Sequence, residues 1–288
     1  MFDLTWHNRA GQKVGTVGEP GVYAHLDLSP DDTRVAVSLQ TQQNGQPLQM
    51  DIWTIDVKPG GGANRVTEDP AYEADPAWSG DGQQLAFNSD RPRRALFVRR
   101  SDGSGKDVRL LEPVQVISAP DWSQDNKTIV YMDGGDLWTL PMTGDRKPAA
   151  FVVNTPATEK QPVFSADGRW VAYISDRSGR DEVYVRAFPR DETVHQVSRE
   201  GGWTPRWRGD GKELFFLSPA SKMMAVSIDP AKGTALGAPH ELFRTDLRPE
   251  YQHRPFDVTQ DGERFLVPTM RPGEDFRIVL DWRALLPK

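Results

Sequence analysis

One short phrase recurs six times along the chain, and this repeat constrains the fold more than any other feature. The phrase places an apolar or aromatic residue before Ser, Thr or Arg, then one variable residue, Asp, and Gly, Asn or Asp. Successive aspartates of the phrase are 42 to 51 residues apart, which is typical of one four-stranded β-propeller blade. The six aspartates are Asp31, Asp81, Asp125, Asp167, Asp210 and Asp261.

Each repeat has the pattern of an antiparallel sheet. Asp followed by Gly or Asn tolerates the positive φ of a tight hairpin turn. The apolar runs that follow, such as 129–131 and 214–216, lack polar alternation, which favours strands covered on both faces. Later segments, such as 51–56, alternate more visibly, and no stretch keeps a helical apolar spacing. We therefore predict an all-β, six-bladed β-propeller made of four-stranded antiparallel blades.

The two ends of the chain carry incomplete repeats. Residues 4–7 and 13–17 have the pattern of third and fourth strands without a first and second. The last repeat has its first two strands, followed by a further strand-like segment at residues 276–282. We expect the terminal strands to share one blade that closes the ring, with residues 1–288 forming a single domain. Which terminus supplies the third strand of that blade is left open.

Composition excludes several classes of protein. The 35 Lys and Arg residues against 41 Asp and Glu give a net charge of −6, without the basic excess of a nucleic-acid binder. No apolar run approaches the roughly 18–20 residues of a membrane-spanning helix. The absence of Cys excludes disulfides and thiolate chemistry. The first residues carry no export signal, which leaves the compartment open.

The motif search favours structural roles. The six turn aspartates are interpreted as caps of local backbone N–H groups rather than metal ligands. No Gly-x-Ser-x-Gly nucleophile motif occurs, and the five histidines lack metal-ligand spacing. We therefore expect no cofactor and no bound metal. The recurrent tryptophans are interpreted as packing between blades, and they are Trp53, Trp78, Trp122, Trp138 and Trp207.

The Ser-x-Asp-Gly turns, the apolar strands after them and the segment 175–184 together resemble the TolB-like six-bladed propellers. Residues 89–91 are a second, partial copy of the Ser-Asp-Arg element within that segment. Segments 4–21 and 278–282 are similar to the propeller that follows the kinase domain of some bacterial serine/threonine kinases. WD-repeat propellers are a poorer match. The resemblance implies a sensor or docking module and slightly favours a periplasmic or extracytoplasmic location.

The candidate binding surface is the mouth of the central channel. Loops that lead into the first strands, and loops that join second to third strands, lie on one face of a propeller, where loops on a rigid scaffold commonly bind. Aromatic residues, Arg and His at such loops are typical of interfaces. The candidate binding residues are Tyr23, His25, Glu73, Asp75, Arg91, Lys160, Arg177, Trp203, Tyr251, His253 and Arg254.

Two functions are compatible with this sequence. The favoured one is a monomeric, non-catalytic module that holds a protein or peptide over the channel mouth. The alternative is a propeller lyase or hydrolase in which His25, Glu73, Asp75 and His253 converge in the channel, with or without a metal ion.

Overall fold

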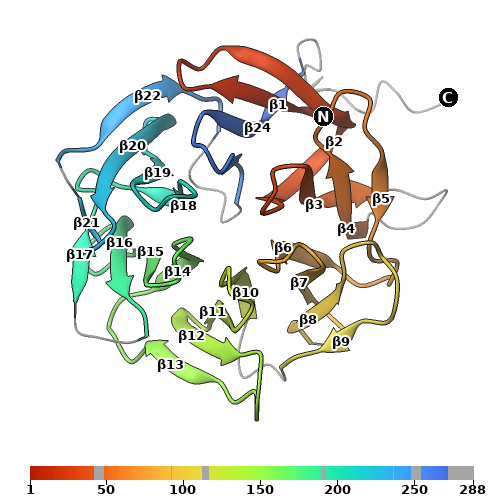
Figure 1. The fold of residues 1–288 in the computed structure, drawn as a ribbon, viewed down its shortest axis with the longest axis horizontal. Coiled ribbons are helices and arrows are strands. Elements are labelled where there is room, and N and C mark those ends of the chain that lie inside the picture. The colour runs from red at the N-terminus through yellow and green to blue at the C-terminus, as the bar shows by residue number, and fades with distance from the viewer. Residues whose placement is uncertain are drawn as a thin grey trace, which may run out of the picture.

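The computed structural model describes residues 1–41, 49–91, 93–111, 117–189, 193–235, 237–247 and 254–271. These residues form β-strands and contain no α-helix. The strands are grouped into sheets arranged radially around a central axis (Figure 1). The all-β propeller predicted from the repeat is confirmed.

Blades 2 to 5 follow the repeat in chain order, each with its first strand nearest the axis. Blade 2 contains β6 (Glu73–Trp78), β7 (Gln84–Ser89), β8 (Ala95–Arg100) and β9 (Val108–Arg109). Blade 3 contains β10 (Ile117–Trp122), β11 (Thr128–Asp133), β12 (Asp136–Pro141) and β13 (Ala149–Val152). Blade 4 contains β14 (Glu159–Phe164), β15 (Trp170–Ser175), β16 (Glu182–Ala187) and β17 (Val194–Gln196). Blade 5 contains β18 (Trp203–Trp207), β19 (Glu213–Leu217), β20 (Lys222–Asp229), β21 (Thr234–Ala235) and β22 (His240–Arg244).

A seven-stranded sheet holds the remaining two blades, because one long strand, β2 (Lys13–Leu28), belongs to both. The end of β2 is the inner strand of blade 1, with β3 (Arg34–Thr41), β4 (Gln49–Asp56) and β5 (Ala63–Arg65). The beginning of β2 is the outer strand of blade 6, with β23 (Asp257–Val258), β24 (Arg264–Met270) and β1 (Phe2–Asn8). The described residues thus form six units, five of four strands and one, blade 5, in which β21 and β22 share the outer position.

The ring closes where β1 pairs with β24 in antiparallel register, from Phe2 opposite Met270 to Asn8 opposite Arg264. The N-terminus therefore supplies the third and fourth strands of blade 6, which answers the question that the sequence left open. Residues 276–282, which the sequence also assigned to this blade, lie outside the described residues.

The hydrophobic core consists of separate clusters, each shared by two neighbouring blades. Trp78 packs between blades 1 and 2, Trp122 and Trp138 between blades 2 and 3, and Trp207 between blades 4 and 5. Trp53 lies half-buried against the cluster between blades 6 and 1. Aromatic burial between blades is therefore what holds adjacent sheets together, as the sequence predicted.

The repeated turns are held by their aspartates. Asp31 Oδ1 accepts hydrogen bonds from Ser29 Oγ at 2.6 Å and from the Thr33 backbone N–H at 3.1 Å. These hydrogen bonds hold the pKa of Asp31 below its ordinary value. Equivalent turn contacts are made by Asp81, Asp125, Asp167, Asp210 and Asp261. The capping role predicted for these residues agrees with this geometry.

Candidate functional site

Five of the six inner strands that line the channel are interrupted by a bulge. In blades 1 to 5 the pairing register shifts within the first strand, for example between Ala74 and Ala77. A bulge bends the strand and redirects the side chains and carbonyl groups near it. Four residues directly before a proline at this level have positive φ, and they are Asp75, Ala119, Gln161 and Thr204. Their backbone geometry shapes the throat of the channel.

Three aspartates in the inner strands bind the backbone of the following blade. Each aspartate stands directly before the apolar or aromatic residue that begins the repeated phrase. The other blades have Ala77, Val163 or Arg206 at this position. Asp27 Oδ2 accepts from the Trp78 backbone N–H at 2.8 Å, Asp121 Oδ2 from Phe164 at 2.8 Å, and Asp257 Oδ2 from Leu28 at 2.7 Å. Each carboxylate is therefore a cross-link between neighbouring blades.

The same three carboxylates, with Arg206, line a cavity of about 90 Å³ at one end of the channel. Arg206 Nε lies 3.0 Å from Asp257 Oδ1. Burial and the neighbouring charge of Asp257 raise the pKa of Asp27 to about 7, and burial also raises the pKa of Asp121. The cavity therefore holds carboxyl groups that take up protons more readily than exposed ones.

Arg254 crosses the channel from blade 6 and is only 1% exposed. Its Nη2 donates to the carbonyl oxygens of Ala119 at 3.2 Å and Pro162 at 3.1 Å, in blades 3 and 4. Its own carbonyl accepts from the Leu26 N–H in blade 1, and Nη1 lies 3.8 Å from Asp121 Oδ1. Arg254 was predicted as a binding residue of the mouth, and the structure places it as a buried brace between blades.

His25 and Asp75 meet in the throat. His25 Nε2 lies 2.8 Å from Asp75 Oδ1, and the other carboxylate oxygen accepts from Asn88 Nδ2 at 2.7 Å and the Ala119 N–H at 3.2 Å. Although burial alone raises the pKa of Asp75, the adjacent His25, together with Arg94 and Arg254, brings it well below its ordinary value. Both side chains are almost fully buried, so this pair joins blades 1, 2 and 3.

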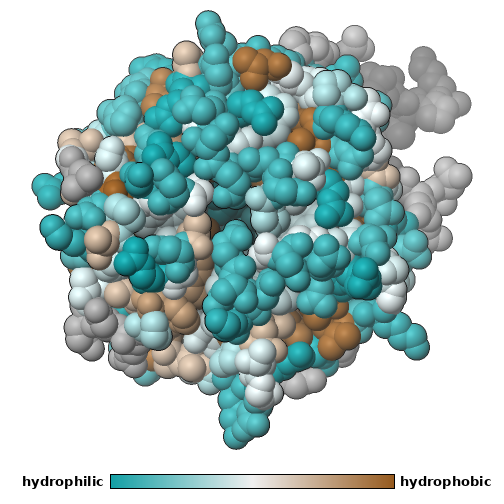
Figure 2. Space-filling view, viewed as in Figure 1, coloured by the Kyte–Doolittle hydropathy of each residue, from teal (hydrophilic) through white to brown (hydrophobic). Residues whose placement is uncertain are grey.

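The rim of the mouth keeps accessible side chains. Lys160 Nζ lies 3.0 Å from both carboxylate oxygens of Asp181, and Trp203 Nε1 donates to Asp181 Oδ2 at 3.1 Å. The side chain of Lys160 is 27% exposed and that of Asp181 is 20% exposed. Tyr72, in the loop before β6, is 40% exposed. Figure 2 shows a narrow hollow at the centre of a largely hydrophilic face.

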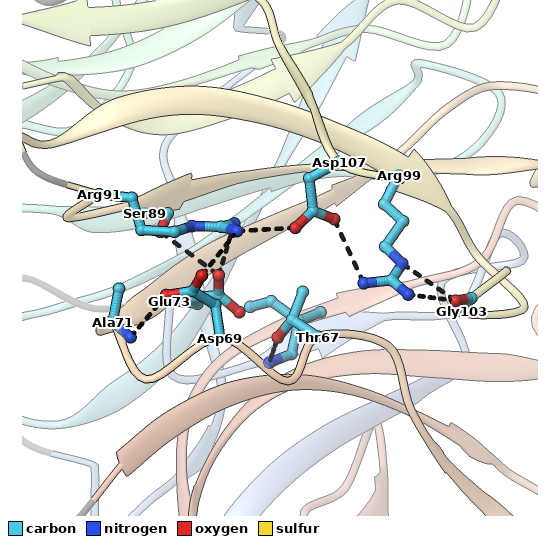
Figure 3. Close-up of polar contacts among 10 residues, drawn as sticks. Thr67, Asp69, Ala71, Glu73, Ser89, Arg91, Arg99, Gly103 and Asp107 are labelled. Atoms are coloured by element: carbon cyan, nitrogen blue, oxygen red, sulfur yellow. Dashed lines mark hydrogen bonds and ion pairs between the residues drawn. The ribbon is translucent and has the colours of Figure 1, made fainter. Parts of the chain in front are cut away.

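Arg91 and Glu73 lie in an ion-pair network rather than at a free rim. Arg91 Nη2 is 2.7 Å from Glu73 Oε1, and its Nη1 is 2.8 Å from Asp107 and 3.3 Å from Asp69 (Figure 3). Ser89 Oγ also donates to Glu73 Oε1, at 3.3 Å. Burial raises the pKa of Glu73, which is fully buried, to about 7. Arg91 and Ser89 thus engage Glu73, while His25 and Asp75 pair with each other.

The Ser-Asp-Arg element at residues 175–177 repeats this arrangement in blade 4. Ser175 Oγ donates to Glu159 Oε1 at 3.2 Å, and Arg177 Nη2 lies 3.4 Å from the same oxygen. The Arg177 guanidinium also lies 5.0 Å from the centre of the Tyr184 ring. The element thus anchors a buried glutamate of the first strand to the end of the second strand, which explains why Ser and Arg recur together.

The remaining predicted residues lie elsewhere. Tyr23 is buried in the cluster between blades 6 and 1, its hydroxyl donates to the Glu19 carbonyl, and burial raises its pKa to about 12. Tyr251 and His253 lie outside the described residues. Sequence reasoning missed Asp27, Asp121, Arg206 and Asp257 as channel residues. The available signal was a charged residue recurring at one position of an otherwise apolar inner strand.

Neither metal-binding nor membrane-spanning features occur in the part of the chain that the structure describes. No group of three or more His, Cys, Asp or Glu side chains there is placed to hold a metal ion. The same residues include no helix of the length and apolar character needed to cross a membrane.

The fold and its polar channel define a β-propeller, and comparisons with known proteins specify which kind. No family model matches the chain. The Uncharacterized peptidase YuxL of Bacillus subtilis is 35% identical over 105 residues, covering 35% of this chain and 16% of YuxL. The Tol-Pal system protein TolB of Francisella tularensis is 24% identical over 174 residues, covering 57% of this chain and 39% of TolB. The chain thus spans less than two fifths of either relative.

The solved structure of a putative TolB from Agrobacterium tumefaciens matches with a TM-score of 0.72 and 17% sequence identity. The match covers 94% of this chain and 98% of that one. The fold is therefore a TolB-like β-propeller.

Proposed function

We propose that this propeller is a non-catalytic binding module that holds a protein or peptide over its channel mouth. The observation that carries the proposal is the half-buried cluster of Trp203, Asp181 and Lys160 at the rim. An aromatic ring held by a hydrogen bond beside a fixed ion pair loses little side-chain freedom on binding, which is typical of interface anchors. Tyr72 adds a second accessible aromatic side chain on the same face.

The buried throat supports this reading. The hydrogen bonds and ion pair of Asp75, His25 and Arg254 connect neighbouring blades. These contacts therefore hold the rim in place. A rigid rim with protruding aromatic and charged groups is the arrangement in which loops on a scaffold bind partners. The TolB-like fold supports the proposal and favours a periplasmic or extracytoplasmic location, which cell fractionation tests.

Affinity capture from the native organism tests the binding role. The variant Y72A/K160A/W203A removes three rim side chains, and the matched control Q83A/K127A/E263A removes three exposed side chains of the turns on the opposite face. Both variants must melt near the parent temperature. We expect the rim variant to lose a captured protein that the control retains. Retention of every captured protein by the rim variant contradicts the proposal.

The alternative, a propeller enzyme, is favoured by the contact between His25 and Asp75 and by the peptidase name of one relative. A His–carboxylate pair is a common acid/base arrangement. Elemental analysis of the purified chain and hydrolysis assays with peptide and oligosaccharide substrates test it. Turnover that His25→Ala abolishes while the chain remains folded supports the enzyme over the binding module.

A further inference from the structure

One position of the third strand carries an aromatic ring in four of the six blades. The rings are Trp53, Phe97, Trp138 and Tyr184, which lie opposite Val37, Phe87, Tyr131 and Tyr173 in the strand register. Each ring belongs to, or packs against, the cluster shared with the preceding blade. The repeat therefore uses an aromatic side chain to fill the groove between consecutive blades at this level.

Blade 6 carries the buried Thr5 at this position, opposite Val267, and blade 5 departs from the pattern in another way. Met224 occupies the equivalent position, opposite Phe216, and packs against the cluster between blades 4 and 5. The outer strand of blade 5 is also divided, because β21 and β22 pair with opposite ends of β20. Met224 is thin and unbranched, and the outer strand above it is divided. Together these two features leave a groove of about 840 Å³ between blades 4 and 5.

The groove has an apolar floor and extended walls. Phe216 and Met224 lie at its floor, residues 194–201 of blade 4 form one wall, and Thr234 and Ala235 of β21 contribute to the other. The groove is lined by both apolar and polar groups, and its volume lies within the range of sites for small organic molecules.

His195 provides a polar group directed toward this groove. It lies opposite Val185 in the register of blade 4, and Val185 belongs to the cluster facing blade 5, so both side chains are on that face. The imidazole packs 6.2 Å from the Trp170 ring. Its Nε2 is buried and has no hydrogen-bond partner among the residues that the structure describes. A buried ring nitrogen without a partner is costly unless a ligand or water meets it.

We propose that this groove binds a small planar aromatic molecule carrying a hydrogen-bond donor. The ligand ring takes the place of the ring that blade 5 lacks, against Phe216 and Met224. The imidazole of His195 turns toward the groove on binding, so that its Nε2, buried in the free chain, accepts from the ligand donor. This site lies between the outer parts of blades 4 and 5, so it is separate from the channel mouth and does not depend on the proposed function.

Titration of the full chain with indole and 1-methylindole tests the polar contact, since only indole carries an N–H donor. We expect saturable binding of both, with indole about three- to tenfold tighter, the usual effect of one hydrogen bond. His195→Ala is expected to reduce indole binding to the level of 1-methylindole. The matched control His240→Ala, an exposed histidine on β22, leaves both affinities unchanged.

Filling the groove tests the apolar contact. Met224→Trp places at this position the kind of aromatic residue found in blades 1 to 4, and Met224→Phe is a smaller replacement if the indole is too large. Either change is expected to raise the melting temperature by roughly 2–4 °C and to abolish indole binding. The absence of saturable indole binding to the parent chain overturns the proposal. Indole binding that survives both His195→Ala and a folded Met224 variant overturns it as well.

Discussion

Asp27 joins blade 1 to blade 2 through two contacts with Trp78. The Trp78 backbone N–H donates to Asp27 Oδ2 at 2.8 Å, and the indole Nε1 donates to the Asp27 carbonyl at 2.9 Å. The carboxyl group is thus needed as an acceptor, but it does not need its charge for this contact. Asp121 and Asp257 make the equivalent backbone contact in other blades, so the channel gathers three carboxyl groups for structural reasons.

Asp27→Asn is expected to stabilise the chain at alkaline pH. Because the folded-state pKa of Asp27 is raised to about 7, its favourable contribution is complete below the unfolded pKa of about 4. That contribution is lost as the pH rises through 7. Asn keeps an oxygen acceptor for Trp78 without the charge, so we expect a gain on the order of 1–3 kcal/mol at about pH 8. Urea unfolding at about pH 5 and about pH 8 measures it. Equal effects of the substitution at both pH values contradict the assignment.

Asp75→Asn is expected to have the opposite pH dependence. The pKa of Asp75 is lowered in the folded chain, so its contribution is present above the unfolded pKa of about 4 and is lost as the pH falls below that value. We expect a loss of roughly 2–4 kcal/mol at neutral pH, because His25 and Arg94 lose their partner. The loss should shrink toward acid. Thermal unfolding across this range checks it, and a loss that grows toward acid speaks against the ion pair.

Arg254→Met is expected to destabilise the ring by about 3–5 kcal/mol, since it removes two hydrogen bonds to carbonyl oxygens and leaves Asp121 without its nearest cation. Arg244, 78% exposed on β22, is the matched control, and its replacement by Met should stay within about 0.5 kcal/mol. Similar free energies of unfolding for the two variants would show that Arg254 does not brace the channel.

Arg91→Ala is expected to cost more stability than Arg177→Ala. Arg91 contacts three carboxylates, whereas the single ion pair of Arg177 is longer, at 3.4 Å. Since the pKa of Glu73 is about 7, the cost of losing Arg91 should increase as the pH rises through 7 and Glu73 ionises. Chemical denaturation of both variants at about pH 6 and about pH 8 compares them. A larger cost for Arg177→Ala contradicts the network.

The architecture could be predicted from the sequence because each blade has the same type of turn, capped by the same residue types. Asp31 and its five equivalents cap their turns in a way that depends only on nearby residues, so local sequence predicts them well. The sequence did not predict which chain end supplies the third strand of blade 6, because residues 4–7 and 276–282 have equally good strand patterns. Pairing with β24 is a contact between chain ends, and no local pattern decides it.

The candidate site was less predictable, because burial in a channel depends on how six inner strands converge. Arg254 and Lys160 both look like solvent-facing loop residues in the sequence. Arg254 reaches carbonyls of two distant blades across the channel, whereas Lys160, next to the bulge of its inner strand, stays at the rim. Whether such a residue is buried, as Arg254 is, or accessible, as Lys160 is, depends on the three-dimensional arrangement of the strands and not on the local sequence.

Site-specific photo-crosslinking tests the central claim, that partners bind at the channel mouth, most directly. A benzophenone amino acid replaces Trp203 at the rim in one variant and Gln83 in an exposed turn of the opposite face in another. After irradiation in native cells, the account predicts a crosslinked partner at position 203 and none at position 83. A partner captured only at position 83 would contradict it.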